Sequence, residues 1–120
     1  DDGLNEDERI EMTLLAAALA GKPGELMFLA SMARRFPGQT SEEVVKSSYR
    51  RYMLEFISRA MGDERSRPVE RREEFAATLR REGRDTDNEL KLADMRVAKE
   101  LERLNNYRMD QLGIPLSSDI

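Results

Sequence analysis

The chain has 120 residues, enough for one domain with a buried core. Charged residues make up 37% of it and sum to a net charge of −4 at pH 7, which argues against nucleic-acid binding through a general positive excess. Both halves share this balance, because residues 1–61 carry ten acidic and eight basic side chains and residues 62–120 carry fourteen and twelve. No apolar stretch is long enough to cross a bilayer, so we expect no transmembrane segment.

Cysteine and histidine are both absent. Their absence excludes disulfides, thiolate zinc sites, cysteine nucleophiles and any imidazole general base. Carboxylates could still bind hard cations, but the spaced D-x-D-x-D-G loop of an EF-hand is missing. We therefore expect no catalytic residues, no metal site and no cofactor, and we expect a protein that is not an enzyme.

Two helices are predicted before residue 37. Asn5 precedes three acidic residues, an N-cap followed by acids where they favour the helix dipole, and apolar residues then recur at helical spacing to about Ala20. Residues 21–24, which include a proline and two glycines, end this helix. A second helix is predicted over 25–36, with an apolar stripe of Leu26, Leu29, Ala30, Met32 and Ala33.

A third helix follows the Pro37-Gly38 turn. Thr40 and Glu43 have the spacing of a capping box, with Thr40 as the N-cap. One face of this helix is apolar and aromatic, while Lys46, Arg50 and Arg51 lie outside that stripe. The stripe predicts a core face, made of Val45, Tyr49, Tyr52, Met53, Phe56, Ile57 and Ala60.

The C-terminal half predicts a charged connector over 62–68 and two more helices. The fourth helix, over 68–81, opens with proline and is apolar only at Val69, Phe75, Ala76 and Leu79. Gly83 breaks it, and Thr86 or Asp87 is expected to cap a last helix over 87–109. That helix has an apolar series typical of a bundle helix, made of Leu90, Ala93, Val97, Leu101 and Leu104.

These elements predict an all-α fold of about five helices. We expect a three-helix bundle over residues 1–61 and a C-terminal helical pair over 62–120, with one continuous domain as the alternative. The sequence leaves open whether the C-terminal pair folds back on the first three helices or extends away.

Residues 4–57 contain the acidic NEDE at the start of the first helix, M-A-R-R-F near the end of the second, and P-G-x-T-x-E-E-V at the start of the third. This arrangement resembles a SANT/Myb-like three-helix module. The resemblance implies that each helix contributes one large residue to a shared core, where the family usually has tryptophan. The corresponding positions in this chain are Leu4, Leu29 and Tyr49.

The same resemblance places the third helix where DNA-reading Myb modules enter the major groove. It implies that Lys46, Ser47, Arg50 and Arg51 are exposed. Glutamates on the same helix would repel phosphate, among them Glu55. The resemblance therefore implies a protein-binding module in the nucleus or cytoplasm rather than a DNA-binding one.

A second resemblance covers residues 44–112. Val45 is followed by Ser48-Tyr49-Arg50, the next predicted helix carries Arg72 and Phe75 in RREEF, and a long helix follows. This pattern is similar to the LYR-motif family, small accessory or assembly subunits of mitochondrial complexes that often bind acyl carrier protein. The family's leucine is replaced by Ser48.

The second resemblance implies specific roles for five side chains. Lys46, Arg50 and Arg51 would face the acidic carrier protein, while Tyr49 and Phe75 would line a groove around its acyl chain. On either resemblance we predict a subunit of a larger assembly, with protein partners and helix-in-groove packing. The predicted partner contacts are Lys46, Tyr49, Arg50, Arg51 and Phe75.

Overall fold

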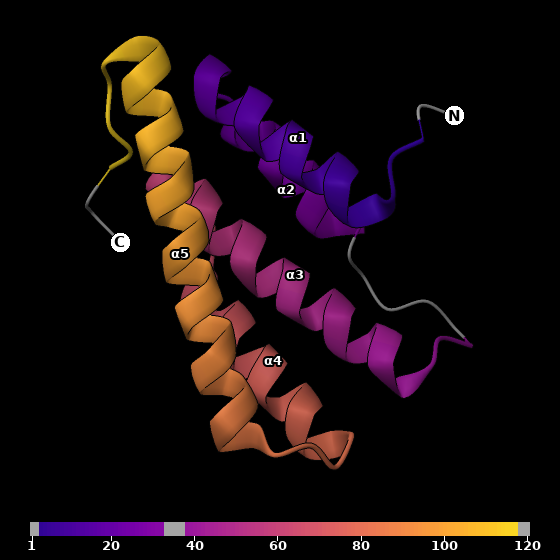
Figure 1. Cartoon of the computed structure of the whole chain (residues 1–120). Helices are drawn as coiled ribbons and strands as arrows, with labels where there is room; N and C mark the ends of the chain where they lie inside the picture. Colours follow the sequence, from indigo (N-terminus) through magenta and orange to yellow (C-terminus); the bar gives the residue numbers. More distant parts are fainter. Residues whose placement is uncertain (1–2, 33–37, 118–120) are drawn as a thin grey trace.

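A computed structural model describes residues 3–32 and 38–117, and these residues form helices joined by short connections (Figure 1). This confirms the predicted all-α fold with five helices. The helices are α1 (Glu6–Ala20), α2 (Pro23–Met32), α3 (Ser41–Ala60), α4 (Pro68–Arg81) and α5 (Thr86–Leu112).

The two predicted N-terminal caps of α1 and α3 are present. At α1 the Asn5 side chain accepts the Glu8 N–H at 2.8 Å, and the Glu8 carboxylate accepts the Asn5 N–H at 3.1 Å. At α3 the Thr40 hydroxyl accepts the Glu43 N–H at 3.2 Å, and the Glu43 carboxylate accepts the Thr40 N–H at 2.9 Å. Each pair satisfies backbone donors that have no partner inside the helix, which fixes where the helix begins.

The predicted boundaries hold for α4 and change for α2 and α5. Helix α2 starts at Pro23, two residues earlier than predicted, and its predicted end lies outside the described residues. The prediction of Thr86 or Asp87 as the cap of α5 is wrong. The Asp85 carboxylate accepts the Asn88 N–H, so Asp85 is the cap and the helix begins at Thr86. Helix α5 also continues to Leu112 instead of ending at Met109.

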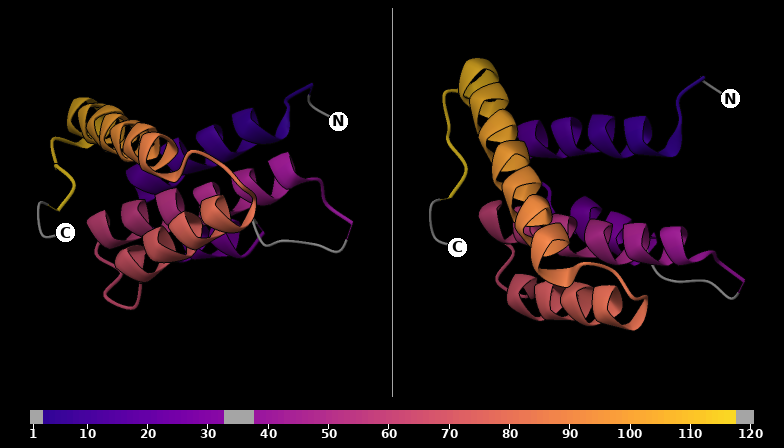
Figure 2. Two further views of the ribbon diagram at one scale, coloured as in Figure 1. Left: turned by 90° about the horizontal axis from the view of Figure 1, so that it is seen from below. Right: turned by 60° about the horizontal axis from the view of Figure 1, so that its bottom comes forward.

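Helix α3 lies at the centre of the arrangement. Helices α2 and α4 pack against it, and α5 crosses it to reach both α4 and α1 (Figures 1 and 2). The C-terminal pair therefore folds back on the N-terminal helices, which answers the question that the sequence left open. The backbone of helix α1 packs on α2 and α5 and lies farther from α3, which it contacts through side chains such as Asp7.

Buried apolar side chains form two clusters, on either side of the α3–α5 crossing. The first joins α1, α2, α3 and α5 through leucine, isoleucine and alanine: Leu14, Ala17, Ala18, Leu26, Ala30, Leu54, Ile57 and Leu104. The second joins α3, α4 and α5 and contains two aromatic rings: Val45, Tyr52, Phe75, Leu79, Ala93 and Val97. We call them the aliphatic core and the aromatic core.

The predicted core faces need correction at three positions. Leu54 is fully buried although it lies outside the predicted stripe of α3, because that helix is covered on more than one side. Ser47, expected to be exposed, is also buried. Val69 is 66% exposed, so the apolar face of α4 is narrower than the sequence suggested.

Candidate binding groove between α1, α3 and α5

Two cavities open along α3 where α5 crosses it. One, of about 300 Å³, lies between α1, α3 and α5, and the other, of about 270 Å³, lies between α3, the α4–α5 connection and the first half of α5. Lys46, Tyr49 and Arg96 line both cavities, so the two adjoin at these side chains. We refer to the pair of cavities as the central groove.

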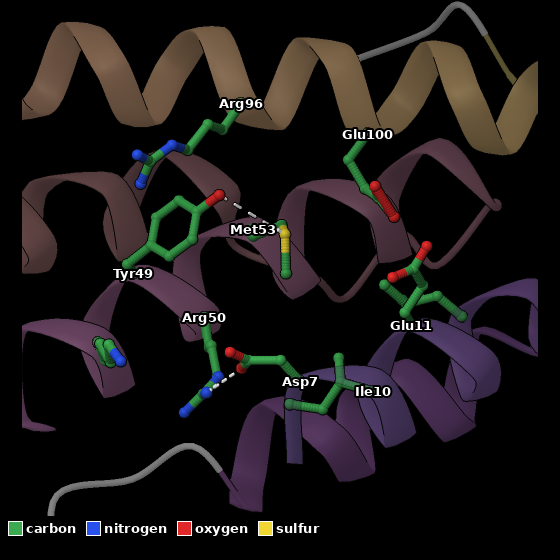
Figure 3. A pocket seen from close by; sticks show the side chains of 10 residues that line it. Asp7, Ile10, Glu11, Tyr49, Arg50, Met53, Arg96 and Glu100 are labelled. Atoms are coloured by element: carbon green, nitrogen blue, oxygen red, sulfur yellow. Dashed lines mark hydrogen bonds and ion pairs between the residues drawn. The ribbon is translucent and has the colours of Figure 1, made fainter. Parts of the chain in front are cut away.

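Tyr49 occupies the junction and is half-buried (Figure 3). Its hydroxyl lies 3.9 Å from the Met53 sulfur, a weak acceptor. Burial raises the pKa of Tyr49, and the positive charge of Arg96 acts in the opposite direction. The phenol is therefore neutral at physiological pH and can donate a hydrogen bond to a better acceptor than sulfur.

Every carboxylate that lines the central groove has an arginine partner. On the α1 side, Arg50 pairs with Asp7 (Figure 3). At the α4–α5 connection, Arg84 contacts Glu42 at 3.0 Å and holds Glu89 through two hydrogen bonds. Arg103 of α5 bridges the two remaining acids, Glu11 and Glu100.

Lys46 and Arg96 differ from these arginines. Both side chains are exposed, and neither makes an ion pair or a hydrogen bond with any residue in the described ranges 3–32 and 38–117. They come from different helices, α3 and α5, and lie at the shared part of the groove. Their positive charges are therefore available to an incoming anion.

The structure brings four of the five predicted contact residues to the central groove. Lys46 and Tyr49 line both cavities, Arg50 lines the first and Phe75 lines the second. Phe75 is only 3% exposed, and its ring centroid lies 5.9 Å from that of Tyr49. Arg51 lies elsewhere, beside Glu74 at 3.9 Å, in a smaller cavity between α3 and α4.

Arg96 is the groove residue that sequence reasoning missed. It lies in the middle of α5, a region whose exposed face is rich in charge, and no local motif distinguishes it from its neighbours. Only the crossing of α5 over α3 places it beside Lys46 and Tyr49, which are about fifty residues earlier in the chain. The pattern of charges along the sequence therefore could not have identified Arg96.

The three core positions implied by the SANT/Myb resemblance fall in different surroundings. Leu29 packs at the edge of the aliphatic core, Tyr49 packs at the edge of the aromatic core, and Leu4 is half-buried before α1. That resemblance stays a prediction.

Glu55 has a structural position that the sequence did not suggest. It was expected to repel phosphate from the third helix, but its side chain is buried under the start of α4. There its Oε1 accepts the Arg67 N–H at 2.9 Å, while Arg67 itself provides no side-chain cap. Arg71 approaches the same oxygen at 4.0 Å. A carboxylate from α3 thus satisfies the N-terminus of α4, where negative charge is favourable.

A second polar cluster ties three helices together beside the aromatic core. The Tyr52 hydroxyl of α3 donates to Asp94 of α5 at 2.8 Å, and Arg72 of α4 binds the same carboxylate through two hydrogen bonds of 3.0 and 2.7 Å. The hydrogen bonds from Arg72 lower the pKa of Asp94. Burial, and then the bond to Asp94, raise the pKa of Tyr52. This cluster fixes α4 and α5 on α3.

Two absences hold for the part of the chain that the structure describes. No group of three or more carboxylates there is arranged to hold a metal ion. None of the described helices combines the length and apolar character needed to span a bilayer. Comparisons with protein-family models, with curated proteins and with solved structures found no match.

Proposed function

We propose that the chain is a non-enzymatic, SANT/Myb-like interaction module of a larger assembly, and that it binds an acidic segment of a protein partner along the central groove. The observation that carries this proposal is a pair of exposed cations, Lys46 and Arg96, which make no ion pair within residues 3–32 and 38–117 and line both cavities together with the half-buried Tyr49. A partner carboxylate placed there would meet two positive charges, and the apolar walls would accept an adjacent side chain.

The charges of the groove favour protein over DNA as the partner. Duplex DNA would bring many phosphates to a surface that also carries five carboxylates, and these carboxylates already neutralise the positive charge of their arginine partners. A peptide needs only one or two acidic side chains at the junction. We expect no measurable binding to a fluorescent DNA duplex at physiological salt.

A capture experiment tests the proposal. The tagged chain, a Lys46→Glu/Arg96→Glu variant and a Lys91→Glu/Lys99→Glu variant are each used to retain proteins from an extract of the source cells, which mass spectrometry then identifies. Lys91 and Lys99 are exposed on α5 and line none of the described cavities of the groove, so the second variant makes the same charge change elsewhere.

We expect a set of proteins that the unaltered chain and the Lys91/Lys99 variant retain and that the Lys46/Arg96 variant loses. Charge reversal at the junction should repel an acidic segment, while reversal on the outer face of α5 should not. Retention of the same proteins by all three chains would contradict the proposal.

A second candidate function is an LYR-type accessory or assembly subunit of a mitochondrial complex that binds acyl carrier protein. The contact between the Tyr49 and Phe75 rings beside the second cavity favours it, because that resemblance requires both rings to line a groove. Titration of the chain with acylated and unacylated acyl carrier protein tests this candidate. Binding of the acylated form alone would support it, and binding of neither form would reject it.

A further inference from the structure

The junction of the central groove has the composition of a small-ligand site. Ile10 and Met53 provide apolar surface in the first cavity, and Val45 and Leu92 provide it in the second. The cavities have about 300 and 270 Å³, each at the lower limit of pockets that bind small molecules. A compact aromatic body of two or three rings therefore suits this space better than a long or branched one.

Three polar side chains line both of these cavities. Lys46 and Tyr49 belong to α3 and Arg96 belongs to α5, and the Tyr49 hydroxyl points toward Met53 in the first cavity (Figure 3). All three groups donate hydrogen bonds, and among the residues that the structure describes the Tyr49 hydroxyl contacts no acceptor but the Met53 sulfur. Within the described part of the chain, these three donors therefore lack a strong acceptor, which an anionic oxygen would supply.

The acidic residues around the junction do not cancel its preference for an anionic group. Glu11 and Glu100 are held by Arg103, and Glu42 and Glu89 are held by Arg84, at the two ends of the groove. Each of these arginines holds two carboxylates, so one negative charge remains at each end of the groove, and the positive charges of Lys46 and Arg96 where the two cavities meet bring the whole groove close to neutral. A ligand gains most when a single anionic group lies at that point and its apolar body extends into a cavity.

We propose that the central groove binds a small organic anion: a sulfonate, carboxylate or phosphate ester with a compact aromatic or apolar body. Lys46 and Arg96 hold the anionic group, Tyr49 donates a hydrogen bond to it, and the walls around Met53 bury the body. This site does not depend on the proposed protein partner, since the isolated chain contains all of it.

Two fluorescent probes with the same aromatic body test the role of charge. Anilinonaphthalene sulfonate carries the anionic group, and N-phenylnaphthylamine is the same ring system without it. Each is titrated into the folded full chain at low ionic strength, and fluorescence gives the affinity and the number of sites. We expect one saturable site for the sulfonate and tighter binding of the sulfonate than of the neutral probe.

Variants at the junction identify the groups responsible. Lys46→Gln/Arg96→Gln should weaken sulfonate binding by about tenfold, since it removes two exposed charged contacts, and should leave binding of the neutral probe unchanged. Tyr49→Phe should weaken sulfonate binding by about threefold, the effect of one hydrogen bond. The matched control, Lys91→Gln/Lys99→Gln, removes the same charge from α5 outside the groove and should change neither affinity.

Circular dichroism checks that each variant is folded, which we expect because Lys46 and Arg96 make no ion pair among the described residues. Equal binding of both probes, or sulfonate binding that survives Lys46→Gln/Arg96→Gln, would overturn the proposal, as would the absence of any saturable site. These outcomes would leave the partner proposal standing, because the capture experiment measures retained proteins. Retention of the same proteins by all three chains of the capture experiment, together with the expected sulfonate binding, would reject only the proposed function.

Discussion

The aliphatic core and the aromatic core stabilise the same bundle in different ways. The aliphatic core is filled by leucine, isoleucine and three alanines, and the alanines allow α1 and α2 to approach their neighbours closely. The aromatic core contains the Tyr52 and Phe75 rings, with centroids 6.3 Å apart, and the Asp94 cluster adjoins it. The comparison shows close packing of small side chains in one region, and large rings in the other, one of which is held by a hydrogen bond.

Removal of a ring should have the largest effect. Phe75→Ala deletes a buried ring that contacts both Tyr49 and Tyr52, and it leaves a cavity that rigid helices cannot fill. We expect a loss of about 3–5 kcal/mol in the free energy of unfolding, measured by urea denaturation. Val69→Ala, on the exposed side of α4, should cost less than about 0.5 kcal/mol. A loss below about 1 kcal/mol for Phe75→Ala would show that the aromatic core does not depend on its ring.

A larger side chain at a buried alanine should destabilise the aliphatic core, because that core depends on close packing of small side chains. Ala18→Leu adds three carbons at a fully buried position where α1 meets its neighbours, so we expect a loss of up to about 3 kcal/mol by the same measurement. Ala16→Leu places the same side chain on the exposed face of α1 and should be nearly neutral. If both variants were equally stable, the alanines would not be setting the distance between helices.

Loss of the buried cap should have an intermediate effect. Glu55→Ala leaves the Arg67 N–H without its acceptor, and we expect a cost of about 2 kcal/mol with faster hydrogen exchange at the start of α4. Glu55→Gln retains an acceptor oxygen and should cost less. Equal exchange in both variants would show that water replaces the carboxylate.

The charge of Asp94 should contribute less than the packing around it. Asp94→Asn removes the negative charge that Arg72 binds but keeps an acceptor, and the group is partly exposed, so we expect about 1 kcal/mol of destabilisation by urea denaturation. Glu102→Gln, an exposed charge change on the same helix, is the control and should cost less than about 0.5 kcal/mol. A cost for Asp94→Asn that matches the control would mean that the aromatic core holds α4 and α5 without this cluster.

The smallest expected effect is a pH dependence confined to the aromatic core. The pKa of Tyr52 is raised in the folded state above its ordinary value of 10.0, so folding favours the neutral phenol. The stabilisation is complete below about pH 10 and is lost as the pH rises above it toward the folded pKa. Tyr52→Phe should reduce this alkaline loss, measured by urea denaturation between about pH 9 and about pH 11. Tyr107→Phe, outside both cores, should not.

Local chemistry explains which parts of the fold could be predicted. Asn5 and Thr40 form caps with residues three positions later, so the start of α1 and the start of α3 are determined within one turn. Residues 85–87 offer three successive capping side chains, and sequence alone could not select Asp85 among them.

Tertiary placement explains what could not be predicted. Leu54 and Glu55 are buried because α2 and α4 cover α3 from different sides, whereas a single apolar stripe implies cover on one side. The same limit applies to the groove. Four of its predicted residues come from α3 and α4, but Arg96 joins them only through the crossing of α5.

The contact between α1 and α5 has a consequence for the order of assembly during synthesis. Helices α2, α3 and α4 pack against neighbours in the chain, so they can associate as soon as each is made. Leu14 of α1 shares its core with Leu104 of α5, which leaves the ribosome some ninety residues later. We therefore expect α1 to keep part of its apolar face in water until translation is nearly complete, and a nascent chain stalled before α5 to be the form most prone to aggregate.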